Sequence, residues 1–415
     1  ASGAGGQIVL VKRLMMTKPL LNELAWRGGP LQRQVLHDLE SILSHPSAQA
    51  RDCLASCLAT ISRVSWNPAW PESDGHARGT LVFGRDDFVR PSEVMHSTVA
   101  KVAVESAALA ERVAAAVKGE SSEAQAEGAS TGGVGDDERK AKEKEEEEEL
   151  KNRRYVLVSW LVSVCPVYEH MYQSPLAPHL PALLPQLLMT IADKDRSLSK
   201  QAKTCTEYVA NTPMLSSAVL PQVLSTAEAM IVSTSWHVRA AVLPFLQTLL
   251  FRHQFVVHKE DMRKVRELVV QLLCDSQVEV REMASSAVSV LVRISGDELA
   301  LSLQGLFRGW CAGPLPKQIK GADGMAAMNL RHAGVLGLAA LIGSHPYDVP
   351  EWMPSILVKL ASHINEPMPV KQTVKNTFGE FWRTHQDAWT QHKDKFAEDE
   401  LTALTDLLVS PTYFS

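Results

Sequence analysis

The chain has 415 residues, of which 45% are hydrophobic and 6% aromatic, and its formal net charge is −5 at pH 7. This small charge does not predict binding to nucleic acid or to an anionic membrane, since both attract a strongly basic surface. The apolar content is sufficient for two or three domains or for one continuous repeat array. The six cysteines have no framework spacing, which indicates reduced, buried thiols of an intracellular protein.

The first residues, "ASGAGGQIVL", have neither a starting Met nor the charged and apolar regions of a secretory signal. We interpret the chain as part of a longer protein. The longest apolar run, "YVLVSWLVSVCPVY" at 155–168, is too short to span a bilayer and favours a buried helix.

Apolar residues recur at helical spacing almost throughout the chain, for example at 31–43, 219–232, 241–250 and 265–275. Alternation with a period of two residues is rare, and only "GTLVFGRDDFV" at 79–89 suggests a hairpin. The fold is therefore predicted to be all-α.

Basic residues recur at similar points of this pattern, the first being Arg51 in "AQARDCL". Lys200, Arg239 and Arg281 are separated by 39 and 42 residues, and Arg331 and Lys371 by 40. The 50-residue step from Arg281 to Arg331 contains "GWCAGPLPKQIKGADG", which is typical of an inserted loop. A period of about 40 residues with two helices each indicates HEAT or armadillo repeats, which stack into an α-solenoid.

We expect each basic residue to begin the second helix of its pair. Ser233, Asp275 and Glu366 each lie a few residues before one of these positions. Such residues can pair with the basic residues of adjacent repeats and form a ladder along the solenoid.

One segment interrupts the repeats. Residues 119–151 are rich in Glu, Lys, Gly and Ser and have almost no large apolar side chains, so burial cannot offset the entropy of ordering them. We predict a disordered acidic insertion, whose "KAKEKEEEEELKNRR" end can be helical. The expected organisation is therefore helical repeats at 1–118, this insertion at 119–151, and C-terminal HEAT-like repeats at 152–415.

No catalytic or nucleotide-binding motif is present. The chain has no P-loop, no G-x-G-x-x-G turn, no G-x-S-x-G elbow and no H-E-x-x-H sequence. Cys53 and Cys57 share a helix face, but two ligands without matching partners do not make a zinc site. We therefore predict no enzyme, no catalytic residues, no metal and no cofactor.

Two further clusters have ordinary structural interpretations. His385 and His392 lie near Asp387 and Asp394, which is compatible with a metal but is more typical of an exposed polar helix face. Four tryptophans are expected to pack in the core or between repeats. An aromatic cage for a modified lysine stays an alternative. The four are Trp66, Trp70, Trp382 and Trp389.

Several long strings resemble the C-terminal end of the proteasome activator complex subunit 4 family. They are "SWHVRAAVLPFLQTLLFRHQF", "VEVREMA", "RHAGVLGL", "HPYDVPEWMP", "TVKNTF", "FWRTHQDAW" and "LTDLLVSP". The resemblance is dense from about residue 195 onward. It implies a large HEAT-repeat activator that caps the proteasome core particle without ATP.

The resemblance also implies a role for the last residues. Family members end in a hydrophobic-Tyr-any tripeptide that inserts between two α-subunits of the core particle, where its carboxylate meets a lysine. Here Tyr413 takes the hydrophobic place, Phe414 the penultimate place, and Ser415 supplies the carboxylate. Phe414 departs from the pattern and lacks the tyrosine hydroxyl, so we expect docking to persist and gate opening to be weaker.

Acetyl-lysine recognition is a second property of the family, associated with an Asn-Phe pair. That pair falls on Ser295 and Gly296 in "LVRISGDEL", and neither residue matches, so acetyl-lysine binding is not carried over. Inositol phosphate binding is also implied by the resemblance, with no residues assigned.

The expected function is thus a proteasome activator that opens the gate of the core particle through its C-terminal tail. The resemblance adds ubiquitin-independent degradation, histone degradation, DNA repair and a location in nucleus and cytoplasm. The expected partner is the α-subunit ring of the core particle, with acetylated histones as a further partner and no direct nucleic acid or membrane. The alternatives are a generic HEAT-repeat adaptor and an acetyl-lysine histone reader.

Overall fold

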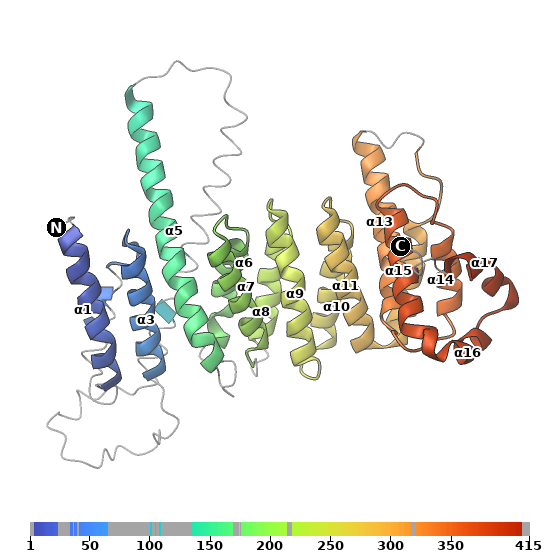
Figure 1. Ribbon diagram of the computed structural model, residues 1–415, viewed down its shortest axis with the longest axis horizontal. Helices are drawn as coiled ribbons and strands as arrows, with labels where there is room; N and C mark the ends of the chain where they lie inside the picture. The colour runs from blue at the N-terminus through green and yellow to red at the C-terminus, as the bar shows by residue number, and fades with distance from the viewer. Residues whose placement is uncertain are drawn as a thin grey trace, which may run out of the picture. The chain divides into compact units, whose positions relative to one another are not determined.

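All regular secondary structure in the described residues of the computed structural model is helical, which confirms the all-α class (Figure 1). These residues are 4–23, 34–64 except 36 and 40, positions 100, 101, 104 and 108, 134–168, 174–213 except 175, 218–316 and 321–408. The hairpin suggested at 79–89 lies outside them. The chain groups into two units, Ala1–Met230 and Ile231–Ser415, whereas the domain boundaries expected at 118 and 151 stay a prediction.

The first unit contains helices that pack in sequence order, with α3 against α1 and α5, and α7 against α5 and α6. Their bounds are α1 (Ala4–Glu23), α3 (Ala48–Val64), α5 (Val134–Tyr168), η2 (Ala177–His179), α6 (Leu180–Ile191), α7 (Arg196–Asn211) and α8 (Val219–Met230). Leu54, Trp160 and Leu187 are among the side chains that these contacts bury.

The charged end of the acidic segment is helical, as its helix formers allowed, and the helix begins at Val134, before the "KAKEKEEEEELKNRR" string. Residues 134–151 form the N-terminal half of α5, which extends beyond the ends of α3 and α6 in Figure 1. This stretch is dense in Glu, Lys and Arg, which are good helix formers. Pairs one turn apart support it, as between Arg153 and Glu149 at 3.0 Å. Residues 119–133 of the predicted insertion lie outside the described residues.

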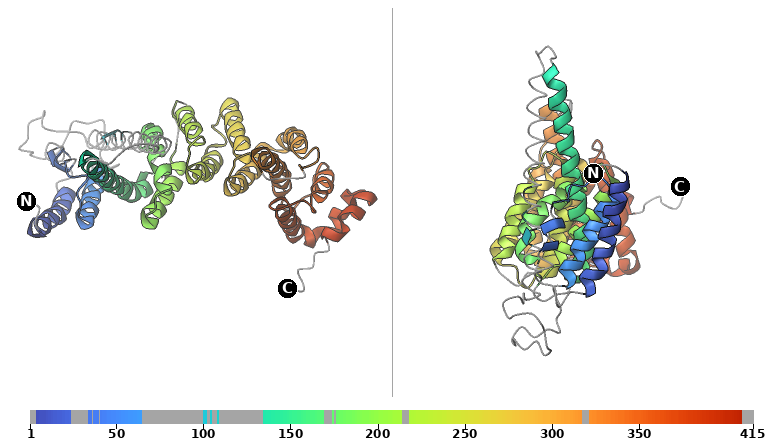
Figure 2. Two further views of the ribbon diagram at one scale, coloured as in Figure 1. Left: turned by 90° about the horizontal axis from the view of Figure 1, so that it is seen from above. Right: turned by 90° about the vertical axis from the view of Figure 1, so that its left-hand side faces the viewer.

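The second unit is built from two layers of helices. In one layer α9, α11, α13 and α15 pack side by side, and α10, α12 and α14 pack against them (Figure 2). The bounds are α9 (Trp236–His253), α10 (Lys259–Leu273), α11 (Val278–Ser295), α12 (Asp297–Trp310), α13 (Ala322–Gly343), α14 (Met353–Ala361), α15 (Val370–His385), η3 (Gln386–Ala388), α16 (Trp389–His392), η4 (Lys393–Lys395) and α17 (Glu398–Leu408).

Apolar spacing explains this packing. In α10 the buried residues Val265, Leu268, Val269 and Leu272 lie three and four positions apart, so they form one stripe. Its exposed face carries Lys and Arg side chains. Each helix pair has an apolar face that only a neighbouring pair can cover, which is why the pairs stack.

The helix α13 is the core helix of this unit. It is long and apolar enough to cross a membrane by length and composition, but 67% of its most apolar window is buried inside the unit. Two glycines let α12 approach it: a Cβ added at Gly337 would lie 2.5 Å from the Phe307 ring, and one at Gly334 would lie 2.7 Å from Cys311 Sγ. Real Cβ atoms do not approach other atoms so closely, so both positions require glycine.

Candidate functional site

The repeated basic residues perform one structural task in several repeats. Arg51, Arg239 and Arg281 are each the fourth residue of their helices, α3, α9 and α11. Each guanidinium donates to the two carbonyls that lie five and six residues earlier. The acceptors are His45 and Pro46 at 2.9 and 2.8 Å, Ser233 and Thr234 at 2.7 and 3.2 Å, and Asp275 and Ser276 at 2.6 and 3.0 Å. The arginine therefore holds the turn before its own helix.

The expected ladder between repeats forms in the second unit. Arg239 donates to Asp275 twice, from Nε to Oδ2 at 2.6 Å and from Nη2 to Oδ1 at 2.8 Å. Burial raises the pKa of Asp275, but the hydrogen bonds from Arg239 and from the Gln277 amide outweigh it and hold that pKa below its usual range. The ion pair thus joins α9 to the turn before α11.

A buried histidine continues this network. Arg281 Nε donates to His332 Nδ1 at 3.1 Å, and His332 Nε2 lies 2.9 Å from the Thr373 hydroxyl. Burial and the Arg281 charge lower the pKa of His332 to about 4. His332 is therefore neutral near pH 7, with its proton on Nε2, and it joins α11, α13 and α15.

Arg331 departs from the expected place. It lies in the middle of α13 rather than at its start, because the good helix formers of "ADGMAAMNL" extend that helix toward its N-terminus. Its guanidinium still binds a turn carbonyl, that of Gly313, and pairs with Glu366 and His363. The second expected ladder contact, Arg331 with Glu366, is therefore present, although the predicted helix start is wrong.

Lys200 and Lys371 show no such contacts, and both side chains are exposed. In the turn before Lys200, the Asp195 carboxylate caps α7 by accepting from the Ser197 and Leu198 amides at 2.9 and 3.3 Å. The carboxylate satisfies backbone amide groups, whereas an arginine clamp satisfies carbonyl groups, so the turn before Lys200 is held by a different kind of contact.

These polar contacts join helices to one another and to the turns before them. All six cysteines are free thiols, and burial raises the pKa of Cys57 and of Cys311 to about 11, so both thiols are uncharged and poorly nucleophilic. Cys274 is exposed, contrary to the expectation of buried thiols. In the part of the chain that the structure describes, no group of three or more His, Cys, Asp or Glu residues could hold a metal.

His385 and His392 are buried rather than exposed, which corrects the sequence interpretation. They are 1% and 6% exposed. His385 lies 2.8 Å from the Phe381 carbonyl through Nδ1 and 3.2 Å from the Asp348 carbonyl through Nε2. The ring of Phe381 stacks on it at 4.2 Å. Trp382 and Trp389 meet edge to face at 5.4 Å, as expected for packing, whereas Trp66 and Trp70 lie outside the described residues.

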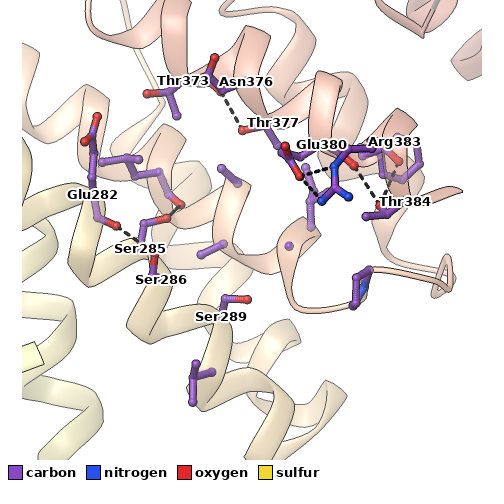
Figure 3. Close-up of a pocket in the computed structure, with 18 of the residues that line it drawn as sticks. Glu282, Ser285, Ser286, Ser289, Thr373, Asn376, Thr377, Glu380, Arg383 and Thr384 are labelled. Carbon is purple, nitrogen blue, oxygen red and sulfur yellow. Dashed lines mark hydrogen bonds and ion pairs between the residues drawn. The ribbon is translucent and has the colours of Figure 1, made fainter. Parts of the chain in front are cut away.

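An open groove that sequence reasoning missed lies in the second unit. Its volume is about 540 Å³, and it runs across α11, α13 and α15 (Figure 3). The floor is apolar, with Leu336, Ala340 and Phe381 among its residues, while hydroxyl and amide side chains stand along its sides. The pair of small polar positions "SS" in "REMASSAV" was the available signal, but a serine pair on a helix is too common to predict a groove.

The predicted site residues lie apart from this groove. Ser295 ends α11, and Gly296 begins the turn to α12 with a φ of 80°, a conformation that favours glycine. Both are exposed, and neither lines the groove. Tyr413, Phe414 and Ser415 lie outside the described residues.

Comparison with protein families gives two matches. Residues 329–415 match the family described as "Proteasome activator complex subunit 4-like, C-terminal", and residues 106–294 match "EF3 N-terminal HEAT repeat". The second match agrees with the stacked helix pairs and confirms the HEAT-like class.

Curated relatives carry the same name as the first family. Proteasome activator complex subunit 4B of Danio rerio is 33% identical over 429 residues. The aligned region covers 100% of this chain and 21% of the length of that relative. Proteasome activator complex subunit 4 of Xenopus laevis is 42% identical over 227 residues. The aligned region covers 52% of this chain and 12% of the length of that relative. Proteasome activator subunit 4 of Arabidopsis thaliana is 27% identical, covering 98% of this chain and 22% of its own.

This chain therefore spans about a fifth of the length of the relatives that cover it almost completely. Similarity extends over both units and includes the C-terminal family match. On these findings the chain belongs to the proteasome activator complex subunit 4 family.

Proposed function

We propose that this chain forms the C-terminal part of a proteasome activator that docks on the end of the core particle and opens its gate without ATP. The observation that carries the proposal is the family match over residues 329–415, which includes Tyr413, Phe414 and Ser415. The chain acts as a non-catalytic regulator in this proposal.

The fold supplies a base for the tail. The helix α17 packs against α14 and α15 and buries Leu404 completely. Its start is fixed because Glu400 Oε2 accepts from the Ala397 amide at 3.0 Å. Pro411 cannot continue a helix. The last residues thus follow directly from a packed helix, which favours insertion of Tyr413, Phe414 and the Ser415 carboxylate between α-subunits.

Binding of the 415-residue chain to purified core particles tests this proposal. Co-sedimentation with the complete chain is compared with a chain that ends at Thr412. A matched control is Tyr347→Ala, which removes a tyrosine that is 77% exposed elsewhere on the second unit. Loss of binding on truncation, but not in the control, supports the tail as the anchor. Equal binding by all three chains contradicts it and favours a generic HEAT-repeat adaptor.

The finer consequences of the resemblance belong to the same proposal. They are degradation of histones independent of ubiquitin, a contribution to DNA repair, a location in nucleus and cytoplasm, and an inositol phosphate ligand without assigned residues. Acetyl-lysine binding at Ser295 and Gly296 is not included, because neither side chain offers the amide that such recognition uses.

A further inference from the structure

We infer that a basic stripe on α7 binds an acidic α-helix of a partner protein. The stripe consists of Arg196, Lys200 and Lys203, and Lys194 adds a fourth cation in the turn before the helix. All four residues are exposed. They lie in the first unit, where α7 packs against α5 and α6 (Figure 1). The inference does not rest on the proposed docking tail.

The three residues of the stripe share one face of α7. They are four and three residues apart, so their side chains leave the helix within roughly 60° of one another around its axis. The opposite face of α7 is buried and includes Leu198, Ala202, Cys205 and Val209. The stripe therefore points out of the first unit, away from the packed helices.

Lys200 stands at the repeat position where other helices carry an arginine that binds its own turn. In α9 and α11 that arginine donates to carbonyls of the preceding turn. Before α7 the turn is held by Asp195, whose carboxylate accepts from the Ser197 and Leu198 amides. Lys200 has no such structural task, so its ammonium group is available to a partner.

The charges of the stripe are not compensated within the described part of the chain, where no ion pair involves any of the four cations. Residues 194–206 contain these four cations and one carboxylate, that of Asp195, so their net charge is +3. The nearby Asp193 already pairs with Arg154 at 2.9 Å. Like charges one turn apart destabilise a helix, and a cation at its first residue, Arg196, opposes the helix dipole. An anionic partner relieves both effects.

Acidic groups lie at the ends of the stripe rather than within it. Glu207 is one turn beyond Lys203 and ends the stripe on the C-terminal side. The hydrogen bonds from α5 to α7 and its preceding turn extend from Arg154 to Ser159, so the acidic run of α5 at 145–149 lies beyond the other end. The basic length along α7 is roughly 10 Å.

The spacing of the cations favours a helix as the partner. Steps of four and three residues advance about 6.0 and 4.5 Å along α7. A second helix has the same two steps, so carboxylates three and four residues apart on one of its faces meet all three cations. In an extended chain, side chains on one face recur evenly at roughly 6.6 Å, which does not match the shorter step.

Fluorescence anisotropy with labelled, Ala-rich helical peptides tests the inference on the complete 415-residue chain. One peptide carries Glu at positions i, i+3, i+4 and i+7, a second carries Lys at the same positions, and a third carries the same number of Glu spread around the helix. We expect the first to bind most tightly, the third to bind more weakly and the second not to bind. Binding should weaken at physiological salt, because exposed charges are screened. Tripolyphosphate as a competitor separates a carboxylate helix from a phosphate ligand.

Matched variants locate the binding surface. Lys200→Gln with Lys203→Gln should weaken binding of the first peptide about two- to thirtyfold, the range of two exposed ion pairs. Lys371→Gln with Lys375→Gln removes two exposed lysines of α15 and changes the net charge of the chain equally, so it should leave binding unchanged. Lys200→Glu with Lys203→Glu should lose the first peptide and bind the Lys peptide instead.

An equal loss of affinity in the α7 and α15 variants would overturn the inference, because the effect would then follow net charge alone. Equal binding of the two Glu peptides, tighter binding of tripolyphosphate than of the first peptide, or binding of no peptide by the folded chain would overturn it as well. Circular dichroism establishes that each variant is folded.

Discussion

Arg239 and Asp275 form a two-point ion pair between consecutive repeats, with 2.6 Å between Nε and Oδ2 and 2.8 Å between Nη2 and Oδ1. The two side chains are only 13% and 7% exposed. The same guanidinium also binds two turn carbonyls. Arg239 thus holds the turn before α9 and also joins α9 to the turn before α11.

Removal of one partner of this pair should destabilise the second unit. Asp275→Asn leaves the Arg239 charge largely buried and uncompensated, so we expect a loss of about 2–3 kcal/mol. Thermal denaturation of the purified chain measures it. The exposed pair Arg263–Glu267, at 65% and 60% exposure, provides the control: Glu267→Gln should change stability by less than about 0.5 kcal/mol. Equal effects of the two substitutions would contradict the ladder.

The histidine at the centre of the second unit, His332, makes stability depend on pH. Its pKa is about 4 in the folded chain and near 6.5 when unfolded. The stability that the neutral ring supplies is complete above about pH 6.5. It decreases as the pH falls and is lost once the pH has passed through about 4, and the total loss is up to about 3 kcal/mol. Melting temperatures between pH 7 and pH 4.5 should therefore fall less steeply in His332→Gln than in the parent chain. Equal slopes would show that His332 is not held neutral by the fold.

The close approach of α12 to α13 predicts a large effect from one methyl group. Gly337→Ala places a Cβ 2.5 Å from the Phe307 ring, and relief of that clash should cost about 1–3 kcal/mol. Gly379→Ala is the control, because a Cβ there meets nothing within 4 Å and alanine favours the helix by about 0.5–1 kcal/mol. The two melting temperatures should move in opposite directions, and a shift in the same direction would contradict this packing.

Sequence periodicity predicts the helices, the repeat class and the equivalence of Arg239 and Arg281. It succeeds there because both arginines hold the turn before their own helices from the fourth helical position. It places Arg331 wrongly, because the N-terminal extension of α13 follows from local helix propensity that the repeat pattern does not include. The helix formers of "KAKEKEEEEELKNRR" allow a helix at the end of the acidic segment, but they do not predict that it begins at Val134, because that start depends on continuity with the buried half of α5.

The site is less predictable. The groove depends on which faces of α11, α13 and α15 meet, and small residues such as Ser285 and Ala339 have no distinctive pattern in a sequence. His332 and His363 give no signal, because a single histidine in an apolar helix, or in the turn after one, indicates neither its partner nor its tautomer. The tail can be assigned only through resemblance, because three terminal residues carry no periodicity.

The missing hydroxyl of Phe414 predicts a gain from one substitution. If the tail inserts as proposed, Phe414→Tyr restores a hydrogen bond worth about 1 kcal/mol, or roughly fivefold in affinity. Competition of two synthetic tail peptides, one with the natural sequence and one with this substitution, for binding to core particles measures the difference. Weaker competition by the substituted peptide would show that the pocket has adapted to phenylalanine and would contradict this prediction.

Gate opening by the tail is tested most directly by peptide hydrolysis with purified core particles. The added peptide is "DLLVSPTYFS", residues 406–415, beside one that ends at Thr412. We predict that the complete peptide stimulates hydrolysis and that the truncated peptide does not. Absence of stimulation by either peptide, with no competition for binding, would contradict the account and leave the chain as a HEAT-repeat adaptor.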